Sequence, residues 1–152
     1  MFQTLTFLHN LTRWLVLAGV LAAIVTAAVG LIRTTPYTRA ANALRHWAAT
    51  IGHLQLVIGM LLYARSPAIS YYWHHPAERS SYPELRFFAL IHPACMLLAI
   101  VLLTIGSGLA KRREGSRSKY RTVLIWHGVA LLIMLAAIPW PFSPLASRPY
   151  WR

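Results

Sequence analysis

Four of the seven histidines fall within or at the edge of long apolar stretches of this chain: His9, His53, His92 and His127. Ionisable side chains are rare inside membrane spans and usually face the interior of a helix bundle. Neutral imidazole is the common axial ligand of haem iron, and bundles build cofactor sites from inward side chains on facing helices. The four imidazoles therefore predict haem iron ligands, with one or two haem b groups.

The elements that would position these rings are membrane-spanning helices. Of the 152 residues, 57% are apolar and 12% are charged, against about 25% charged residues in soluble domains. Uncharged runs near or above the 18 to 20 residues that cross a bilayer as helix cover 14–32, 47–64, 87–110 and 122–147. We expect an all-α, up-down-up-down bundle of four transmembrane helices in one domain, 1–152, with helices at about 5–32, 42–65, 84–110 and 119–140 and an interfacial C-terminal tail over 141–152.

The charge distribution predicts an orientation. The net charge is +12, and the basic residues lie mainly in the first connection, with Arg33, Arg39 and Arg45, and in the third, over 111–121. By the positive-inside bias these connections are cytoplasmic, which places both termini on the periplasmic side of a bacterial inner membrane. The expected partners are the lipid bilayer, anionic lipids at the cytoplasmic loops and other membrane protein subunits, with no nucleic acid.

The first apolar stretch is expected to stay in the protein as a helix. The first cationic residue, Arg13, follows a mostly apolar opening. A secretory signal peptide would instead begin with a basic region.

Depth in the membrane suggests which rings could pair. At about 1.5 Å of rise per residue, His53 lies about 12 Å from Arg45 and His127 about 9 Å from Arg121. His9 lies about 36 Å from Arg33, whereas His92 lies about 28 Å from Lys111. Depth therefore favours His53 with His127 and makes the outer pair weaker, while a cross-pair of His53 with His92 stays open.

A weak internal repeat adds a second argument. Each half of the chain carries one histidine early in its first span, His9 or His92, and one in the inner half of its second span, His53 or His127. A two-plus-two repeat would place equivalent residues at one depth on opposite helices. Both pairs together would hold two haems stacked across the bilayer.

Two arginines are candidates for binding the haem propionates, and a quinone is a second candidate ligand. Arg13 lies one helical turn after His9, and Arg86 lies near the outer start of the third span. The alternative for an arginine at a helix end is to extend its charged group to the lipid headgroups.

Other functions stay open. The intramembrane histidines could instead hydrogen-bond between helices, to a carbonyl or to Thr50, Gln55 or Thr104, in a cofactor-free accessory subunit of a larger membrane complex. A small metal-handling or transport protein using His74, His75 and the intramembrane imidazoles is a third alternative. Because the chain has no paired carboxylates, nucleophile elbow or phosphate-binding glycine loop, we expect an electron carrier or complex subunit rather than a catalyst.

The chain also resembles a group of small bacterial four-helix membrane proteins labelled cytochrome b-like. The resemblance lies in Leu8-His9-Asn10-Leu11-Thr12-Arg13, Gly52-His53-Leu54-Gln55-Leu56-Val57-Ile58-Gly59, Leu85-Arg86-Phe87-Phe88 through His92-Pro93, and Ile138-Pro139-Trp140-Pro141-Phe142. It implies a bundle in which His9, His53 and His92 hold family-like positions, with no counterpart for His127. An acid often precedes the His-Pro pair in that family, whereas this chain has Ile91, so a proton-coupled role there is not expected.

Overall fold

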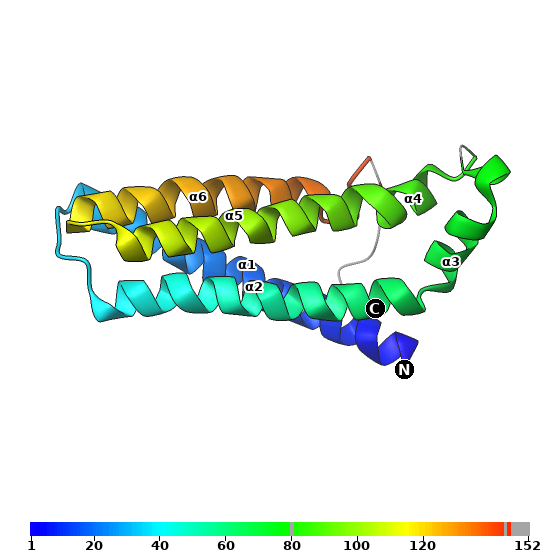
Figure 1. The fold of residues 1–152 in the computed structure, drawn as a ribbon, viewed down its shortest axis with the longest axis horizontal. Coiled ribbons are helices and arrows are strands. Elements are labelled where there is room, and N and C mark those ends of the chain that lie inside the picture. Colours follow the sequence, from blue (N-terminus) through cyan, green and yellow to red (C-terminus); the bar gives the residue numbers. More distant parts are fainter. Residues whose placement is uncertain (80, 145, 147–152) are drawn as a thin grey trace.

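Four helices of this protein are long and apolar enough to cross a membrane. The computed structural model describes residues 1–79, 81–144 and 146. The first two spans are α1, Phe2–Ile32, and α2, Arg39–Arg65. The third joins α4, Pro83–Arg86, a π-helical segment, Phe87–Ile91, and α5, His92–Arg112. The fourth is α6, Ser116–Ala137, and the four pack as the predicted all-α bundle (Figure 1).

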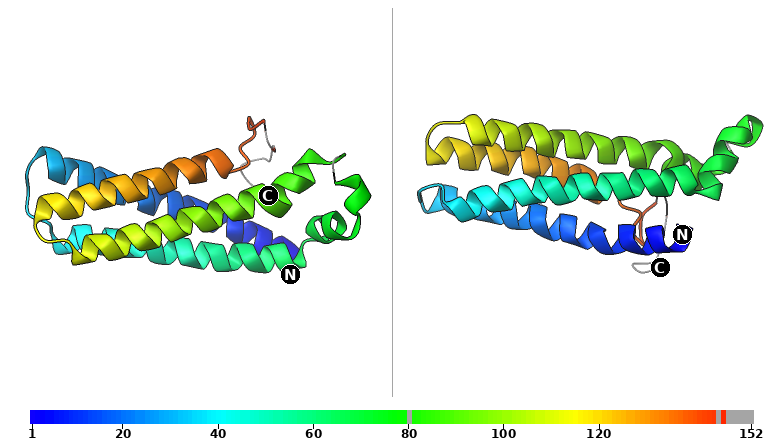
Figure 2. Two further views of the ribbon diagram at one scale, coloured as in Figure 1. Left: turned by 45° about the horizontal axis from the view of Figure 1, so that its top comes forward. Right: turned by 60° about the horizontal axis from the view of Figure 1, so that its bottom comes forward.

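The four spans alternate in direction and form a closed ring in the order α1, α2, α5, α6. Helix α1 packs against α2 and α6, and α5 packs against α6 and more sparsely against α2, so α1 and α5 lie on opposite sides (Figure 2). We call the end that holds the connections 33–38 and 113–115 the basic end. The opposite end, where α1 begins and α6 ends, is called the terminal end.

Alanines are the commonest buried residues of the bundle, and large apolar side chains cover much of its outside. Ala27, Ala48 and Ala130 are among the buried residues, whereas Leu15 and Leu132 are among many large exposed apolar side chains. Lipid gives no hydrophobic drive for helix association, so small residues that allow close backbone approach stabilise the packing. An apolar exterior around a core of small residues is what a bilayer requires of a bundle.

Gly106 sets the approach of α5 to α6, and its substitution is expected to destabilise the bundle. A side chain at this position would meet Trp126 well inside contact distance, whereas one at Gly108 would meet nothing within 4 Å. We expect Gly106→Val to lower the unfolding free energy in detergent by about 1 to 3 kcal/mol through overpacking. Gly108→Val is the matched control, and an equal loss in both variants would contradict this account.

The connection between the second and third spans is compact and rich in aromatic residues. It contains α3, Pro67–His74, and a 3-10 helix, Pro76–Glu78. The Tyr71 hydroxyl donates a hydrogen bond to Glu78, and this bond raises the pKa of Tyr71 to about 12. Arg79 donates to the carbonyls of Tyr72 and Trp73, so the chain here is folded back on itself.

The end of the fourth span differs slightly from the expected helix over 119–140. Helix α6 begins earlier, at Ser116, and ends at Ala137, because Pro139 cannot donate a helical hydrogen bond. Of the tail predicted over 141–152, residues 145 and 147–152 lie outside the described part of the chain.

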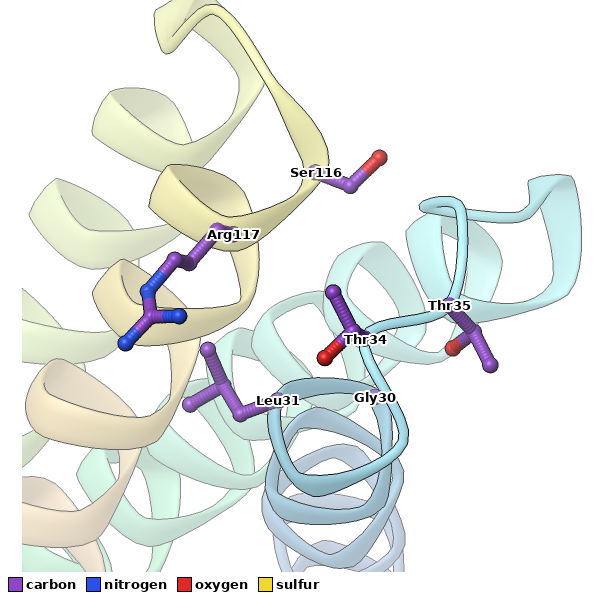
Figure 3. Close-up of a pocket in the computed structure, with 6 residues that line it drawn as sticks. All are labelled: Gly30, Leu31, Thr34, Thr35, Ser116 and Arg117. Carbon is purple, nitrogen blue, oxygen red and sulfur yellow. The ribbon is translucent and has the colours of Figure 1, made fainter.

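Tyrosine contacts tie the two connections of the basic end together. The Tyr37 and Tyr120 rings lie 4.8 Å apart, the Tyr120 hydroxyl donates to the Pro36 carbonyl at 3.0 Å, and the Tyr37 N–H donates to Ser116 Oγ at 2.8 Å. A small cavity of about 50 Å³ lies beside them, lined by Gly30, Leu31, Thr34, Thr35, Ser116 and Arg117 (Figure 3). It is far smaller than the roughly 300 Å³ at which ligand pockets begin.

Candidate histidine site

His9 and His92 come together between two opposite helices. Their ring centroids lie 6.3 Å apart with an angle of 71° between the ring planes. His9 lies on α1 and His92 is the first residue of α5, and both side chains are partly buried. The structure therefore brings two of the four predicted imidazoles into one site, toward the terminal end of the bundle.

Pro93 explains the local structure that presents His92. Because proline has no N–H, it cannot donate to the carbonyl of Ala89 four residues earlier, and the π-helical segment Phe87–Ile91 directly precedes this point. The Tyr63 hydroxyl on α2 donates to that Ala89 carbonyl instead, at 3.1 Å. A freed carbonyl in a membrane span needs such a partner, so Tyr63 ties α2 to the start of α5.

Both rings are fixed through Nδ1. The Nδ1–H of His92 donates to the carbonyl of Ala137 at the end of α6, at 2.8 Å. A hydrogen bond of 3.2 Å joins His9 Nδ1 to Gln55 Nε2, and that amide also donates to the His9 carbonyl at 2.8 Å. Within the described residues, neither Nε2 has a protein hydrogen-bond partner. For His92, whose Nδ1–H donates, Nε2 is the nitrogen that would meet a metal. His9 Nδ1 instead accepts from the Gln55 amide, so the neutral His9 ring carries its proton on Nε2.

Gly59 allows α2 to approach His9. A Cβ atom at Gly59 would lie 3.1 Å from His9 Cε1, tighter than ordinary contact. Gln55 precedes Gly59 by one turn of α2, so the residue that bonds the imidazole and the residue that makes room for it share a helix face. The two account for how α2 positions a ring that belongs to α1.

Arg13 lies beside this ring pair and two phenylalanines lie beside His92, whereas Arg86 lies apart. Arg13 is close enough to both imidazoles to interact with them electrostatically, and its guanidinium lies 5.2 Å from the Trp14 ring centroid. Phe87 and Phe88 lie 5.9 and 6.3 Å from the His92 ring. Arg86 is exposed, and no contact with either histidine is found within the described residues.

His53 lies outside this site, on an exposed groove between α2 and α5. Its Nδ1–H donates to the Ala49 carbonyl at 2.7 Å, and its Nε2 lies 3.1 Å from Thr104 Oγ1 on α5. His9 bonds to Gln55 and His53 bonds to Thr104, as expected if the histidines join helices and do not bind haem. Polar pairs of this kind stabilise membrane helix contacts by about 1 kcal/mol.

His127 is completely buried and lies apart from His53. Its exposed fraction is 0%. The backbone of Arg45 is the polar group that lies near the His127 ring. Neither ring nitrogen has a partner at hydrogen-bond geometry in the described part of the chain. No ring contact joins His53 and His127 within that part, so the pairing that depth favoured is not the pair that this structure brings together.

The buried, unpartnered ring of His127 gives a stability prediction. An unsatisfied buried polar group costs about 1 to 3 kcal/mol. We therefore expect His127→Leu to raise the unfolding free energy in detergent by about 1 to 2 kcal/mol, measured from the midpoint of denaturant unfolding. His53→Leu is the comparison, because it removes a ring that has hydrogen bonds. A large loss of stability in His127→Leu would refute this account and indicate a bound partner at that ring.

The depth argument rests on an assumption that this bundle does not meet. Counting residues assumes parallel helices and basic residues at one level, whereas α1 crosses the bundle obliquely (Figures 1 and 2). The His9 and His92 rings lie 6.3 Å apart, centroid to centroid, despite their different residue counts from the basic end. The repeat argument paired His9 with His92 and His53 with His127. The structure brings only the first of these pairs together, so the repeat stays a prediction.

Sequence reasoning missed Tyr63 and the Ala137 carbonyl as supports of the site. Pro93 is the signal that could have revealed the first, because it leaves the Ala89 carbonyl without its helical donor. Backbone acceptors such as Ala137 leave no signal in side-chain types.

Metal ligands other than a histidine pair are not gathered anywhere in the described structure. No group of three or more His, Cys, Asp or Glu side chains is placed to hold a metal ion there. The exposed rings of His74 and His75 bond to the carbonyls of Ser70 and Tyr71.

The fold defines the class of protein: a multi-pass membrane protein built as a four-helix bundle. No protein-family model, curated protein or solved structure matches the chain. Its function is therefore inferred from the site itself.

Proposed function

We propose that this protein is a haem b-binding membrane cytochrome that transfers electrons, as a subunit of a respiratory or other energy-transducing membrane complex. The observation that carries the proposal is the convergence of His9 and His92 from opposite helices. Haem b, when bound, would supply a one-electron iron couple. This chain would supply the two imidazoles, the bonds that orient them and a cation at their side.

The residues present fit a haem with two histidine ligands. Two imidazoles that each bind one metal ion at about 2 Å have ring centroids about 6 Å apart, and the observed separation is 6.3 Å. The Nδ1–H of His92 donates to the protein, which leaves its Nε2 for the iron. For His9 to bind iron through Nε2, its proton must move to Nδ1 and the Gln55 amide must withdraw from that atom. Arg13 is the cation placed to pair with a propionate, whereas exposed Arg86 is not.

Haem stoichiometry tests the proposal. The protein would be expressed with haem precursor, purified in mild detergent, and assayed by the pyridine haemochrome method against protein concentration. Because one histidine pair converges, we expect about one haem b per chain. A haem content near zero in folded protein would overturn the proposal, and two haems per chain would require His53 and His127 as further ligands.

The histidine contacts also favour the second candidate, a cofactor-free accessory subunit. His9, His53 and His92 already form hydrogen bonds between or within helices, with Gln55, Thr104 and Ala137 as partners between helices. In that case the rings would hold the bundle together and bind nothing. Loss of His92 would then lower stability without changing any absorbance in the visible region.

A further inference from the structure

An open polar groove lies between α2 and α5 near the basic end. Its volume is about 390 Å³. It runs along the contact between α2 and α5, which is sparser than the other contacts between neighbouring spans. Residues from 42 to 53 on α2 and from 104 to 111 on α5 line it, so it extends about 17 Å along the helices. The haem proposal does not use this groove, although the hydrogen bonds of His53 with Thr104 and of Arg45 with Ser107 join α2 to α5 along it.

The groove is strongly positive. Its lining includes Arg45, His46 and Lys111 and no acidic residue. Arg45 is only 5% exposed, yet its guanidinium is held by neutral acceptors: the Ser107 carbonyl at 2.7 Å, the Ser107 hydroxyl, and Asn42 Oδ1 at 3.0 Å. These bonds satisfy its N–H groups but leave its charge unbalanced. The donor groups of His46 and Lys111 therefore lie near the positive charge of Arg45, which no acidic residue of the lining balances.

The shape of the lining matches a lipid. Lys111 and His46 lie at the basic end of the groove, and Thr50, Thr104 and His53 continue it into the span. One turn beyond, Val57 and Val101 are exposed apolar residues. The groove thus passes from cations to hydroxyls to apolar surface, the order of the phosphate, ester and acyl regions of a phospholipid.

We propose that this groove is a binding site for the phosphate group of an anionic phospholipid. Arg45 sets the positive potential, Lys111 and His46 contact the phosphate, and the hydroxyls of Thr50 and Thr104 lie at the level of the ester groups. Basic pockets between membrane helices commonly bind anionic headgroups. A free phosphate ion would use the same cations but would gain nothing from the deeper part of the groove.

Native mass spectrometry of the purified full chain tests this site. Phosphatidylglycerol, phosphatidylcholine and inorganic phosphate would be titrated separately into the delipidated protein. We expect one tightly held phosphatidylglycerol. Lys111→Ala should weaken its binding about fivefold, the effect of about 1 kcal/mol per surface cation.

Arg112→Ala is the matched control, because Arg112 is the exposed neighbour of Lys111 and does not line the groove. It should weaken binding less than twofold. Equal weakening in the two variants, or none in either, would overturn the site in favour of diffuse surface attraction. Phosphatidylcholine binding as tightly as phosphatidylglycerol would also overturn it. Saturation by inorganic phosphate, sensitive to Lys111→Ala and without a lipid preference, would overturn the lipid as the source of the phosphate.

Discussion

His92→Ala is expected to lower the haem content of the purified protein by more than about tenfold, since even residues that only support metal ligands change metal affinity 10- to 100-fold. His92 leads because its Nδ1–H is held by the Ala137 carbonyl, which leaves Nε2 for the iron, and because its ring lies 6.3 Å from that of His9. His9→Ala should act similarly. Haem content would be measured by absorbance per mole of folded chain.

Two comparisons separate ligation from folding in this experiment. His53→Ala should keep its haem, because His53 lies on the groove between α2 and α5 with Thr104. Gln55→Leu removes a bond to His9 Nδ1 without removing either ring, so it should weaken haem retention less than His9→Ala does. If His53→Ala loses haem while His92→Ala keeps it, the proposed ligand pair is wrong.

Arg45→Leu is expected to destabilise the bundle by about 2 to 3 kcal/mol, because it removes charge-assisted hydrogen bonds worth about 1.5 to 3 kcal/mol. Arg45 links α2 to α5 through the Ser107 carbonyl and hydroxyl and bonds Asn42 on its own helix. The measurement is the midpoint of unfolding in a detergent titration.

Arg39→Leu is the control for the loss of charge, because Arg39 is exposed at the start of the same helix. It should change the midpoint little. Leucine in place of a buried ionic group can also be stabilising when the ion is poorly compensated. An Arg45→Leu variant as stable as the original protein would therefore show that desolvation of the guanidinium cancels its hydrogen bonds.

The fold class was predictable from the sequence because span length and charge exclusion are strong signals in a bilayer. Four uncharged runs predicted four spans, and four suitable helices are present. The local structure at the start of the third span was harder to predict, because a π-helical segment lies where Pro93 interrupts the helical hydrogen bonds. Pro139 similarly ended the fourth span before residue 140.

Which imidazoles would meet was not predictable by counting residues. Helix rotation is hard to infer when nearly every face is apolar, so the outward position of His53 and the buried position of His127 left no trace in the pattern. Arg45 was interpreted as part of a basic connection, whereas it is buried. Its acceptors belong to Ser107, which lies 62 residues later in the sequence on another helix. No local sequence pattern predicts that these two residues meet.

The central claim is that His9 and His92 form one haem site, and a reduced-minus-oxidised absorption spectrum of the purified protein tests it most directly. The account predicts a Soret peak and a reduced α-band in the original protein and in His53→Ala, and less than about a tenth of either signal in His92→Ala. Well-folded original protein with no absorbance in the visible region would contradict the account.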